Sequence, residues 1–225
     1  MESLRQRLML WDGRLHNGTK LQFLQKLLRT ADSICLLTNE PLTEALEEWQ
    51  NANKDRVFVA SYHELQSALA DHADRVIIAL SMPDKPIKQV ITACKENSVQ
   101  QLILLYDQDD CQDAVEALDK KYPDRNSMIV EYRNLVAKLK STSTVLENQL
   151  EVSPVALKVF QELGFINISH GLVSMGQVKK SNLEDSPYYA GMRKEKASLY
   201  RLYTENMRLS QYELLRCNTS ERGRH

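Results

Sequence analysis

The sequence predicts an α/β protein in which a mainly parallel, five-stranded sheet with helices on both faces is followed by a smaller, mostly helical part. Short apolar runs alternate with amphipathic stretches over residues 1–125, and this alternation is typical of β–α units. The alternation ends at a segment around Pro123. Helical spacing and one β-hairpin pattern follow. We therefore expect two domains, 1–125 and 126–225.

The strands of the first domain are predicted from apolar runs that are typical of strands buried on both faces. These runs lie at residues 8–11, 34–37, 57–60, 76–80 and 102–106. The stretches between and after them carry apolar residues at helical spacing, at residues 19–31, 42–53, 61–73, 87–97 and 110–121. Because parallel strands need crossover connections, the expected architecture is Rossmann-like.

In the second domain, helical patterns at residues 127–140 and 144–150 come first. The pair Ser153-Pro154 then supplies an N-cap residue followed by a first-turn proline, which predicts the start of a further helix. That helix is expected to run through Leu163 and to end at Gly164.

The remainder of the second domain is predicted to be a hairpin followed by a long helix. Apolar residues alternate over residues 165–175 around His170-Gly171, which indicates a β-hairpin. Together with the preceding helices it forms a winged-helix-like α+β pattern. A long C-terminal helix is expected over residues 188–215, and a frayed tail over 218–225.

Charge is distributed unevenly along the chain. Residues 1–125 hold 15 Lys and Arg against 20 Asp and Glu, a net −5, whereas residues 126–225 hold 14 against 10, a net +4. Such asymmetry is typical of a protein with one basic, partner-facing surface. A net charge of +4 is too small to indicate nucleic-acid binding by itself.

The sequence also indicates a cytoplasmic protein. Its first residues lack the basic stretch and apolar run of a secretory signal. Its longest apolar runs are far shorter than the ~20 residues of a membrane helix. The four cysteines show no paired spacing, which favours reduced, structural thiols over a disulfide or zinc framework.

One alternative function is a nucleotide-binding regulatory domain that uses the turn from Gly13 to Lys20. This turn places two glycines between a predicted strand and a predicted helix, but its order is Gly-Thr-Lys. A phosphate-binding loop requires Gly-Lys followed by Ser or Thr, so that lysine reaches the phosphates and the hydroxyl binds magnesium. No Gly-x-Gly-x-x-Gly motif is present, which argues against NAD or FAD.

A second alternative is a metal-dependent phosphotransfer or hydrolase enzyme. Carboxylates gather at the predicted strand ends, at Asp12, Glu40, Asp84, Asp107, Asp109 and Asp110. Of these, Asp12 and Asp107 are the candidate metal ligands, because magnesium prefers oxygen ligands. We favour helix capping for Asp109 and Asp110, since acidic residues are common at helix N-termini. The five histidines are dispersed, and no nucleophile motif such as Gly-x-Ser-x-Gly is present.

The basic half carries the most informative candidates. Five of the nine tyrosines lie between residues 188 and 212, interleaved with cations. Aromatic rings stack on bases while cations neutralise phosphates, so this composition favours single-stranded nucleic acid. Helical spacing of Leu199, Tyr203 and Met207 indicates that some tyrosines belong to a core instead. The candidate DNA- or partner-binding residues are Lys179, Lys180, Tyr188, Tyr189, Arg193, Lys194, Lys196 and Arg201.

Four segments share a pattern with a known family. They are Trp11-Asp12-Gly13-Arg14; Pro123-Asp124-Arg125 followed by Tyr132; residues 155–166 with Gly171-Leu172-Val173; and residues 180–189. Together they resemble the C-terminal accessory domain of bacterial RecJ-type single-strand-DNA-specific exonucleases, over nearly the whole chain.

The resemblance implies a noncatalytic module that is joined to a nuclease core in the same polypeptide. The Asp-His-His motif with which that core binds manganese or magnesium is absent from this sequence, so the chain is expected to have no metal or other cofactor of its own. The implied role is to help the exonuclease engage single-stranded DNA, or single-strand DNA-binding protein, in recombination and repair. A site for that protein's acidic tail needs a basic residue and an apolar pocket. The sequence alone does not locate such a pocket.

Overall fold

The structure is a computed structural model that describes residues 8–14, 18–72, 74–178 and 181–208. Its contacts divide the chain into two compact units. The first, which we call the sheet unit, combines residues up to Ala114 with residues from Arg201 onward; the second, the hairpin unit, comprises Val115–Tyr200. The single boundary that we expected between residues 125 and 126 stays a prediction.

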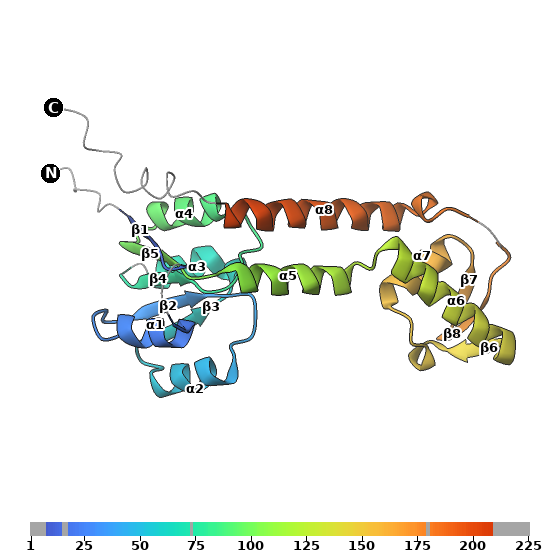
Figure 1. Cartoon of the computed structure of the whole chain (residues 1–225), viewed down its shortest axis with the longest axis horizontal. Coiled ribbons are helices and arrows are strands. Elements are labelled where there is room, and N and C mark those ends of the chain that lie inside the picture. The colour runs from blue at the N-terminus through green and yellow to red at the C-terminus, as the bar shows by residue number, and fades with distance from the viewer. Residues whose placement is uncertain (1–7, 15–17, 73, 179–180, 209–225) are drawn as a thin grey trace, which may run out of the picture. The chain divides into compact units, whose positions relative to one another are not determined.

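The sheet unit contains the expected five-stranded parallel sheet, which confirms the α/β class (Figure 1). The strand order is β1-β5-β4-β2-β3, and every neighbouring pair is parallel. The strands are β1 (Met9–Asp12), β2 (Ile34–Leu37), β3 (Val57–Ala60), β4 (Val76–Ala79) and β5 (Gln101–Leu104). Each lies at an apolar run in the sequence, and the central strands β5, β4 and β2 are covered on both faces.

Helices cover the two faces of this sheet. On one face, α1 (Lys20–Leu27) and α2 (Glu44–Ala52) contribute Leu24 and Leu46 to a core with β2, β3, β4 and β5. On the other face, the 3₁₀ helix η1 (Tyr62–Glu64), α3 (Leu65–His72) and α4 (Ile87–Glu96) pack on all five strands.

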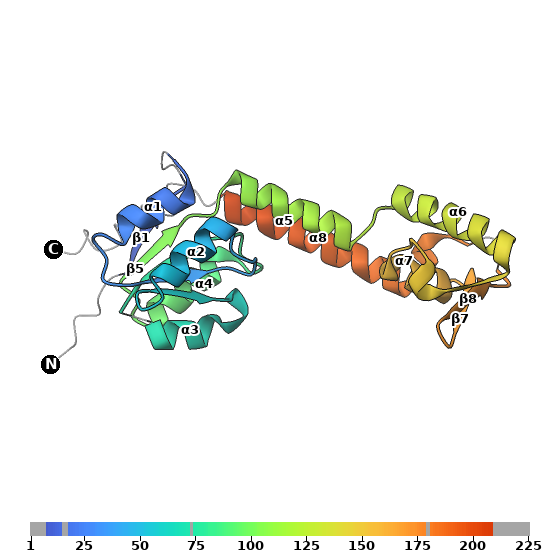
Figure 2. The same cartoon turned by 90° about the horizontal axis from the view of Figure 1, so that it is seen from below.

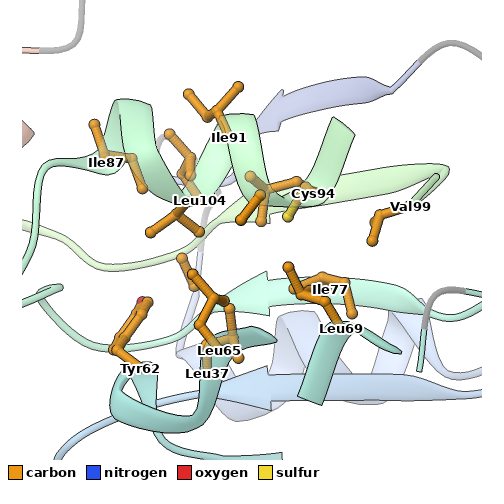
Figure 3. Close-up of a cluster of buried hydrophobic side chains, with 14 of the residues drawn as sticks. Leu37, Tyr62, Leu65, Leu69, Ile77, Ile87, Ile91, Cys94, Val99 and Leu104 are labelled. Carbon is orange, nitrogen blue, oxygen red and sulfur yellow. The ribbon is translucent and has the colours of Figure 1, made fainter. Parts of the chain in front are cut away.

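The core beneath α3 and α4 is built from close-packed aliphatic side chains (Figure 3). Leu69 of α3 and Ile91 and Cys94 of α4 gather around Ile77 and Leu104 of the sheet. Burial raises the pKa of the Cys94 thiol to about 12, so this side chain acts as a small apolar residue.

Two long helices each contribute to both units. Helix α5 (Gln108–Lys121) follows β5, and α8 (Pro187–Met207) lies near the end of the described chain. In the sheet unit, Cys111 and Ala114 of α5 and Tyr203 and Met207 of α8 pack against the same core. The expectation that part of the tyrosine-rich helix is core is therefore confirmed for Tyr203. The helix end that we predicted at residue 215 and the tail lie outside the described residues.

The hairpin unit begins with α6 (Arg125–Thr142) and includes α7 (Pro154–Glu162), which lies beside the hairpin β7 (Ile166–Ser169) and β8 (Leu172–Met175) (Figure 2). As expected, the Ser153 hydroxyl caps α7, accepting from the amide of Ala156 at 3.2 Å, and Gly164 with a φ of 72° follows the helix. Only glycine adopts that conformation without strain. The hairpin around His170 and Gly171 is also confirmed.

The helix that we predicted at residues 144–150 is wrong. Residues Thr144–Leu146 form a strand, β6, and Glu147–Gln149 form a 3₁₀ turn, η2. Strand β6 joins the hairpin in an antiparallel sheet of order β6-β8-β7, in which Val145 pairs with Val173. Both valines are buried, so packing against a neighbouring strand decides the conformation of this short segment. The winged-helix description of this unit stays an interpretation.

None of the helices in the described ranges is long and apolar enough to span a lipid bilayer.

Candidate partner-binding groove

The structure gives the sequence candidates on α8 different environments. Tyr189 is buried with 2% exposure, whereas Tyr188 lies half-buried with the Lys158 ammonium 4.0 Å from its ring centre. Lys194 and Arg201 are exposed. Lys179 and Lys180 lie outside the described residues.

Lys196 is held inside the hairpin unit. Its ammonium donates to the carbonyl of Tyr122 at 2.7 Å and lies 2.8 Å from a carboxylate oxygen of Asp119. The Tyr200 hydroxyl donates to the same carboxylate, and this bond raises the pKa of Tyr200 to about 12. Because only 18% of the Lys196 side chain is exposed, its main role is to join α8 to the end of α5.

Three of the candidate residues nevertheless line one groove. Tyr189, Arg193 and Lys196 of α8 face the connector between α5 and α6 across a space of about 450 Å³. The other residues that line this cationic groove are Pro123, Asp124, Arg125, Glu184, Met192, Ala197 and Tyr200. All of them belong to the hairpin unit.

A second, more apolar pocket of about 260 Å³ lies in the same unit. Three aromatic rings form part of its lining: the Tyr132 ring centre lies 5.3 Å from that of Phe160 and 5.0 Å from that of Phe165. The remaining lining residues are Arg125, Met128, Ile129, Ser181, Asn182 and Leu183. Ile129 is 37% exposed, so this aromatic pocket opens to solvent beside an apolar side chain.

Arg125 lines both spaces. It is the first residue of α6, and the carboxylate of the N-cap residue Asp124 accepts from the amide of Ser127 at 2.7 Å. This bond holds the pKa of Asp124 below its usual value. The cap fixes where α6 starts and hence where the backbone of Arg125 lies.

The guanidinium of Arg125 is available to a ligand. It lies 3.9 Å from Glu184, and Arg193 lies 3.3 Å from the same carboxylate. Both arginine side chains are about 60% exposed, at 61% and 60%. Exposed ion pairs contribute little stability, about 0–1 kcal/mol, so an incoming carboxylate or phosphate can compete for these cations.

Sequence reasoning missed most of the aromatic pocket. Met128, Ile129, Phe160 and Phe165 are residue types that a helical or strand pattern assigns to a core. The connector from Pro123 to Arg125, together with Tyr132, could have indicated the pocket. In the sequence these residues served only as part of the family resemblance.

At the sheet, the candidate metal ligands Asp12 and Asp107 make local bonds. The Asp12 carboxylate accepts from the side chain of Arg14 at 2.8 and 2.9 Å. Asp107 caps α5 by accepting from the amides of Asp109 and Asp110 at 3.0 and 3.1 Å. Within the described ranges, no group of three or more His, Cys, Asp or Glu residues is placed to hold a metal ion.

Asp110 and Lys20 bond to each other. The Asp110 carboxylate accepts from the amide of Asp107 and pairs with the ammonium of Lys20. The cap that we expected from Asp109 and Asp110 is thus supplied by Asp107, with Asp110 completing it. Lys20 also donates to the carbonyl of Leu80 at 3.3 Å, so the lysine of the candidate nucleotide turn is engaged within the sheet unit.

The position where an open parallel sheet usually binds ligands lies at the carboxyl ends of β2 and β4, because the strand order reverses there. The hydroxyls of Thr38 and Ser81, which follow those strands, are buried and hydrogen-bonded at 3.0 Å. Next to them, the Asn206 side chain of α8 donates to the carbonyls of Pro83 and Lys85 at 3.1 Å. The chain's own polar groups therefore bond to each other at this edge.

Comparison with known proteins decides the family. The model of the C-terminal domain of single-strand-DNA-specific exonucleases matches residues 10–213, which run through both units. This chain belongs to that family. A search of curated proteins found no match, and a search of solved structures found none.

Membership of the exonuclease C-terminal domain family confirms the resemblance seen in the sequence. The match begins within β1 and extends beyond Met207, so the sheet, the hairpin unit and α8 all belong to the family's domain. The groove and the aromatic pocket are therefore features of an exonuclease C-terminal domain.

Proposed function

We propose that this chain is a noncatalytic accessory module of a single-strand-DNA-specific exonuclease, which brings the nuclease to its substrate by binding the acidic tail of single-strand DNA-binding protein. In this proposal the nuclease core is part of the same polypeptide and uses Mn²⁺ or Mg²⁺. The assembly acts in the cytoplasm, in recombination and repair.

The observation that carries the proposal is the position of Arg125 between an aromatic pocket and a cationic groove. An acidic tail that ends in an apolar residue needs a cation for its terminal carboxylate and an apolar pocket for its side chain. Arg125 meets the first need. The pocket lined by Tyr132, Phe160 and Phe165 meets the second. Arg193, farther along the groove, suits the acidic residues upstream.

A second candidate function, direct binding of single-stranded DNA, is favoured by the exposed cations of α8. Lys194 is an exposed cation of the hairpin unit, and Arg201 is an exposed cation of the sheet unit. Phosphates bind such exposed cations, and the affinity falls steeply with salt.

One binding experiment tests both candidates. The full chain is titrated against a fluorescent peptide that carries the last residues of the binding protein's tail, and separately against an oligo-dT strand. Replacing Arg125 with Glu is expected to weaken peptide binding about tenfold or more, since it reverses the charge facing the carboxylate. Arg133→Glu, an exposed residue of the same helix outside both spaces, is the matched control.

The DNA arm uses Lys194→Glu and Arg201→Glu. If DNA is a direct ligand, these variants weaken oligo-dT binding and reduce its salt dependence, while peptide binding stays unchanged. Peptide binding that survives both Arg125→Glu and amidation of the peptide's terminal carboxylate would contradict the tail site. Absence of binding to peptide and DNA alike would remove the accessory role proposed here.

A further inference from the structure

Strand β1 exposes an apolar surface at the edge of the large sheet. Met9 is 41% exposed and Trp11 is 56% exposed, whereas the intervening Leu10 is 1% exposed. Side chains alternate between the two faces of a strand, so Met9 and Trp11 share one face and Leu10 points to the other. We call the exposed pair the β1 face.

Among the described residues, the helices on this side of the sheet share no core with the β1 face. Leu8 and Leu10 belong to the core under α3 and α4, which places the β1 face on the side of α1 and α2. The core beneath α1 and α2 includes Ile103 of β5 and Leu105, which follows that strand, but no residue of β1. A tryptophan and a methionine at the uncovered end of a sheet are typical of an interface centre, where both residue types are enriched.

We propose that the β1 face is the surface on which the nuclease core of the exonuclease docks. This inference rests on the proposed function, in which the core and this domain belong to one polypeptide. The family's model is that of a C-terminal domain, and its match starts at residue 10, inside β1. In such a polypeptide the chain leaves the core and enters this domain through β1, so the core is the partner that the connection holds beside Met9 and Trp11.

The charges next to the β1 face agree with an apolar partner. Asp12, the next residue of the strand, is 19% exposed and its carboxylate is paired with Arg14. By the same alternation its side chain lies on the face of Leu10, so among residues 9–12 no charged side chain shares the β1 face. Depletion of charge at the centre is what separates a docking surface from ordinary protein surface.

The opposite edge of the sheet provides a matched control. Val59 of β3 is 44% exposed, and it shares a face with Val57, which belongs to the core under α1 and α2. Val59 and Trp11 are thus exposed apolar residues on the same face of the sheet, on its two edge strands. Of these two residues, only Trp11 lies where the match to the family's domain begins.

The test measures binding of the full chain to the nuclease core of the exonuclease from the same genome, produced as a separate polypeptide. Trp11→Glu is expected to weaken this binding about tenfold or more, because a charge at an interface centre has to be desolvated. Val59→Glu is expected to change it less than about twofold. Circular dichroism verifies folding, and Met9→Glu replaces Trp11→Glu if the latter fails to fold.

Three results would overturn the docking surface: no binding of the wild-type chain to the core, equal losses in Trp11→Glu and Val59→Glu, or a wild-type dimer that Trp11→Glu dissociates. The last result assigns the face to a second copy of this chain. The tail peptide is titrated against the same samples. If the wild-type chain binds the core but not the peptide, only the tail-binding function is contradicted. If it binds the peptide but not the core, only the docking surface is contradicted.

Discussion

At the scale of single residues, the end of β1 shows how one ion pair organises several parts of the sheet unit. Arg14 binds the Asp12 carboxylate, donates to the carbonyl of Met207 at 3.3 Å and lies 5.8 Å from the ring centre of Tyr106. Only 12% of its side chain is exposed. The bonds within this pair account for Asp12 and Arg14 at the end of the first strand. Neither a metal ion nor a phosphate is needed to explain them.

Burial by itself raises the pKa of Asp12, but the hydrogen bonds from the side chain and backbone of Arg14 outweigh it, and the net pKa is lowered. A carboxyl whose pKa is lower in the folded state stabilises the fold above its unfolded pKa, about 3.9. That stability is lost as the pH falls through the folded pKa.

We therefore predict that Asp12→Asn lowers the free energy of unfolding by about 1–3 kcal/mol at pH 7, since it leaves a largely buried guanidinium without its carboxylate. The difference from wild type shrinks as the pH is lowered below about 4, where the wild-type carboxyl also becomes neutral. Urea unfolding at several pH values measures both effects. Glu48→Gln, at an exposed position of α2, is the control. A difference that stays constant down to pH 2 would contradict this account.

At the scale of elements, two glycines of the hairpin unit have opposite surroundings. A Cβ atom added to Gly176, just after β8, would lie 2.0 Å from the carbonyl oxygen of Gly164, beyond the end of α7. A Cβ atom added to Gly191 in α8 would meet nothing within 4 Å. The first glycine permits a close approach of two backbones, whereas the second only weakens a helix.

Gly176→Ala is accordingly expected to destabilise the hairpin unit by about 1–3 kcal/mol, because the hairpin has to move away from α7. Gly191→Ala is expected to stabilise the chain by about 0.5–1 kcal/mol through the higher helix propensity of alanine. Urea unfolding measures whether each substitution lowers or raises the free energy of unfolding. Amide hydrogen exchange is expected to place the effect of Gly176→Ala in the hairpin unit. Equal effects of the two substitutions would show that the close approach is not important.

Elements with a strong local pattern could be predicted from the sequence. The five strands are apolar on both faces, and α7 has a capping serine, a first-turn proline and a terminal glycine. Strand β6 could not be predicted, because three residues carry too little pattern and their conformation depends on a partner strand. The aromatic pocket likewise combines α6, Phe160 of α7, Phe165 and residues 181–183, which lie apart in the sequence and meet only in the fold.

At the scale of the whole molecule, the sheet unit is completed by the last described turn of the chain. The Asn206 side chain is 1% exposed, and besides its bonds to Pro83 and Lys85 it accepts from the amide of Ile87 at 2.9 Å. The Tyr106 hydroxyl donates to the Asn206 carbonyl at 3.1 Å. The Asn206 side chain thus supplies hydrogen-bond partners to the first amide of α4 and to two carbonyls of the loop before it. These groups lie far from Asn206 in the sequence.

Asn206→Leu is predicted to lower the free energy of unfolding by about 2–4 kcal/mol, because it leaves the buried Ile87 amide and two carbonyls without partners. The exposed neighbour Glu205, changed to Gln, is the control. Limited proteolysis is expected to cut Asn206→Leu faster near the end of α8. If neither the free energy of unfolding nor the cleavage rate changes, water bonds to these backbone groups as well as Asn206 does, and the prediction is wrong.

Because Asn206 is synthesised long after the strands that it completes, it also affects the order in which the protein folds during synthesis. The hairpin unit is one continuous segment and can form once Tyr200 has been made, whereas the sheet unit needs residues from both ends of the chain. About 100 residues separate Tyr106 from Asn206, and translation at about 5–20 residues per second takes roughly 5–20 s to add them. For that interval the nascent sheet lacks the hydrogen bonds of Asn206, and the carboxyl ends of its strands are open to chaperones until α8 has been made.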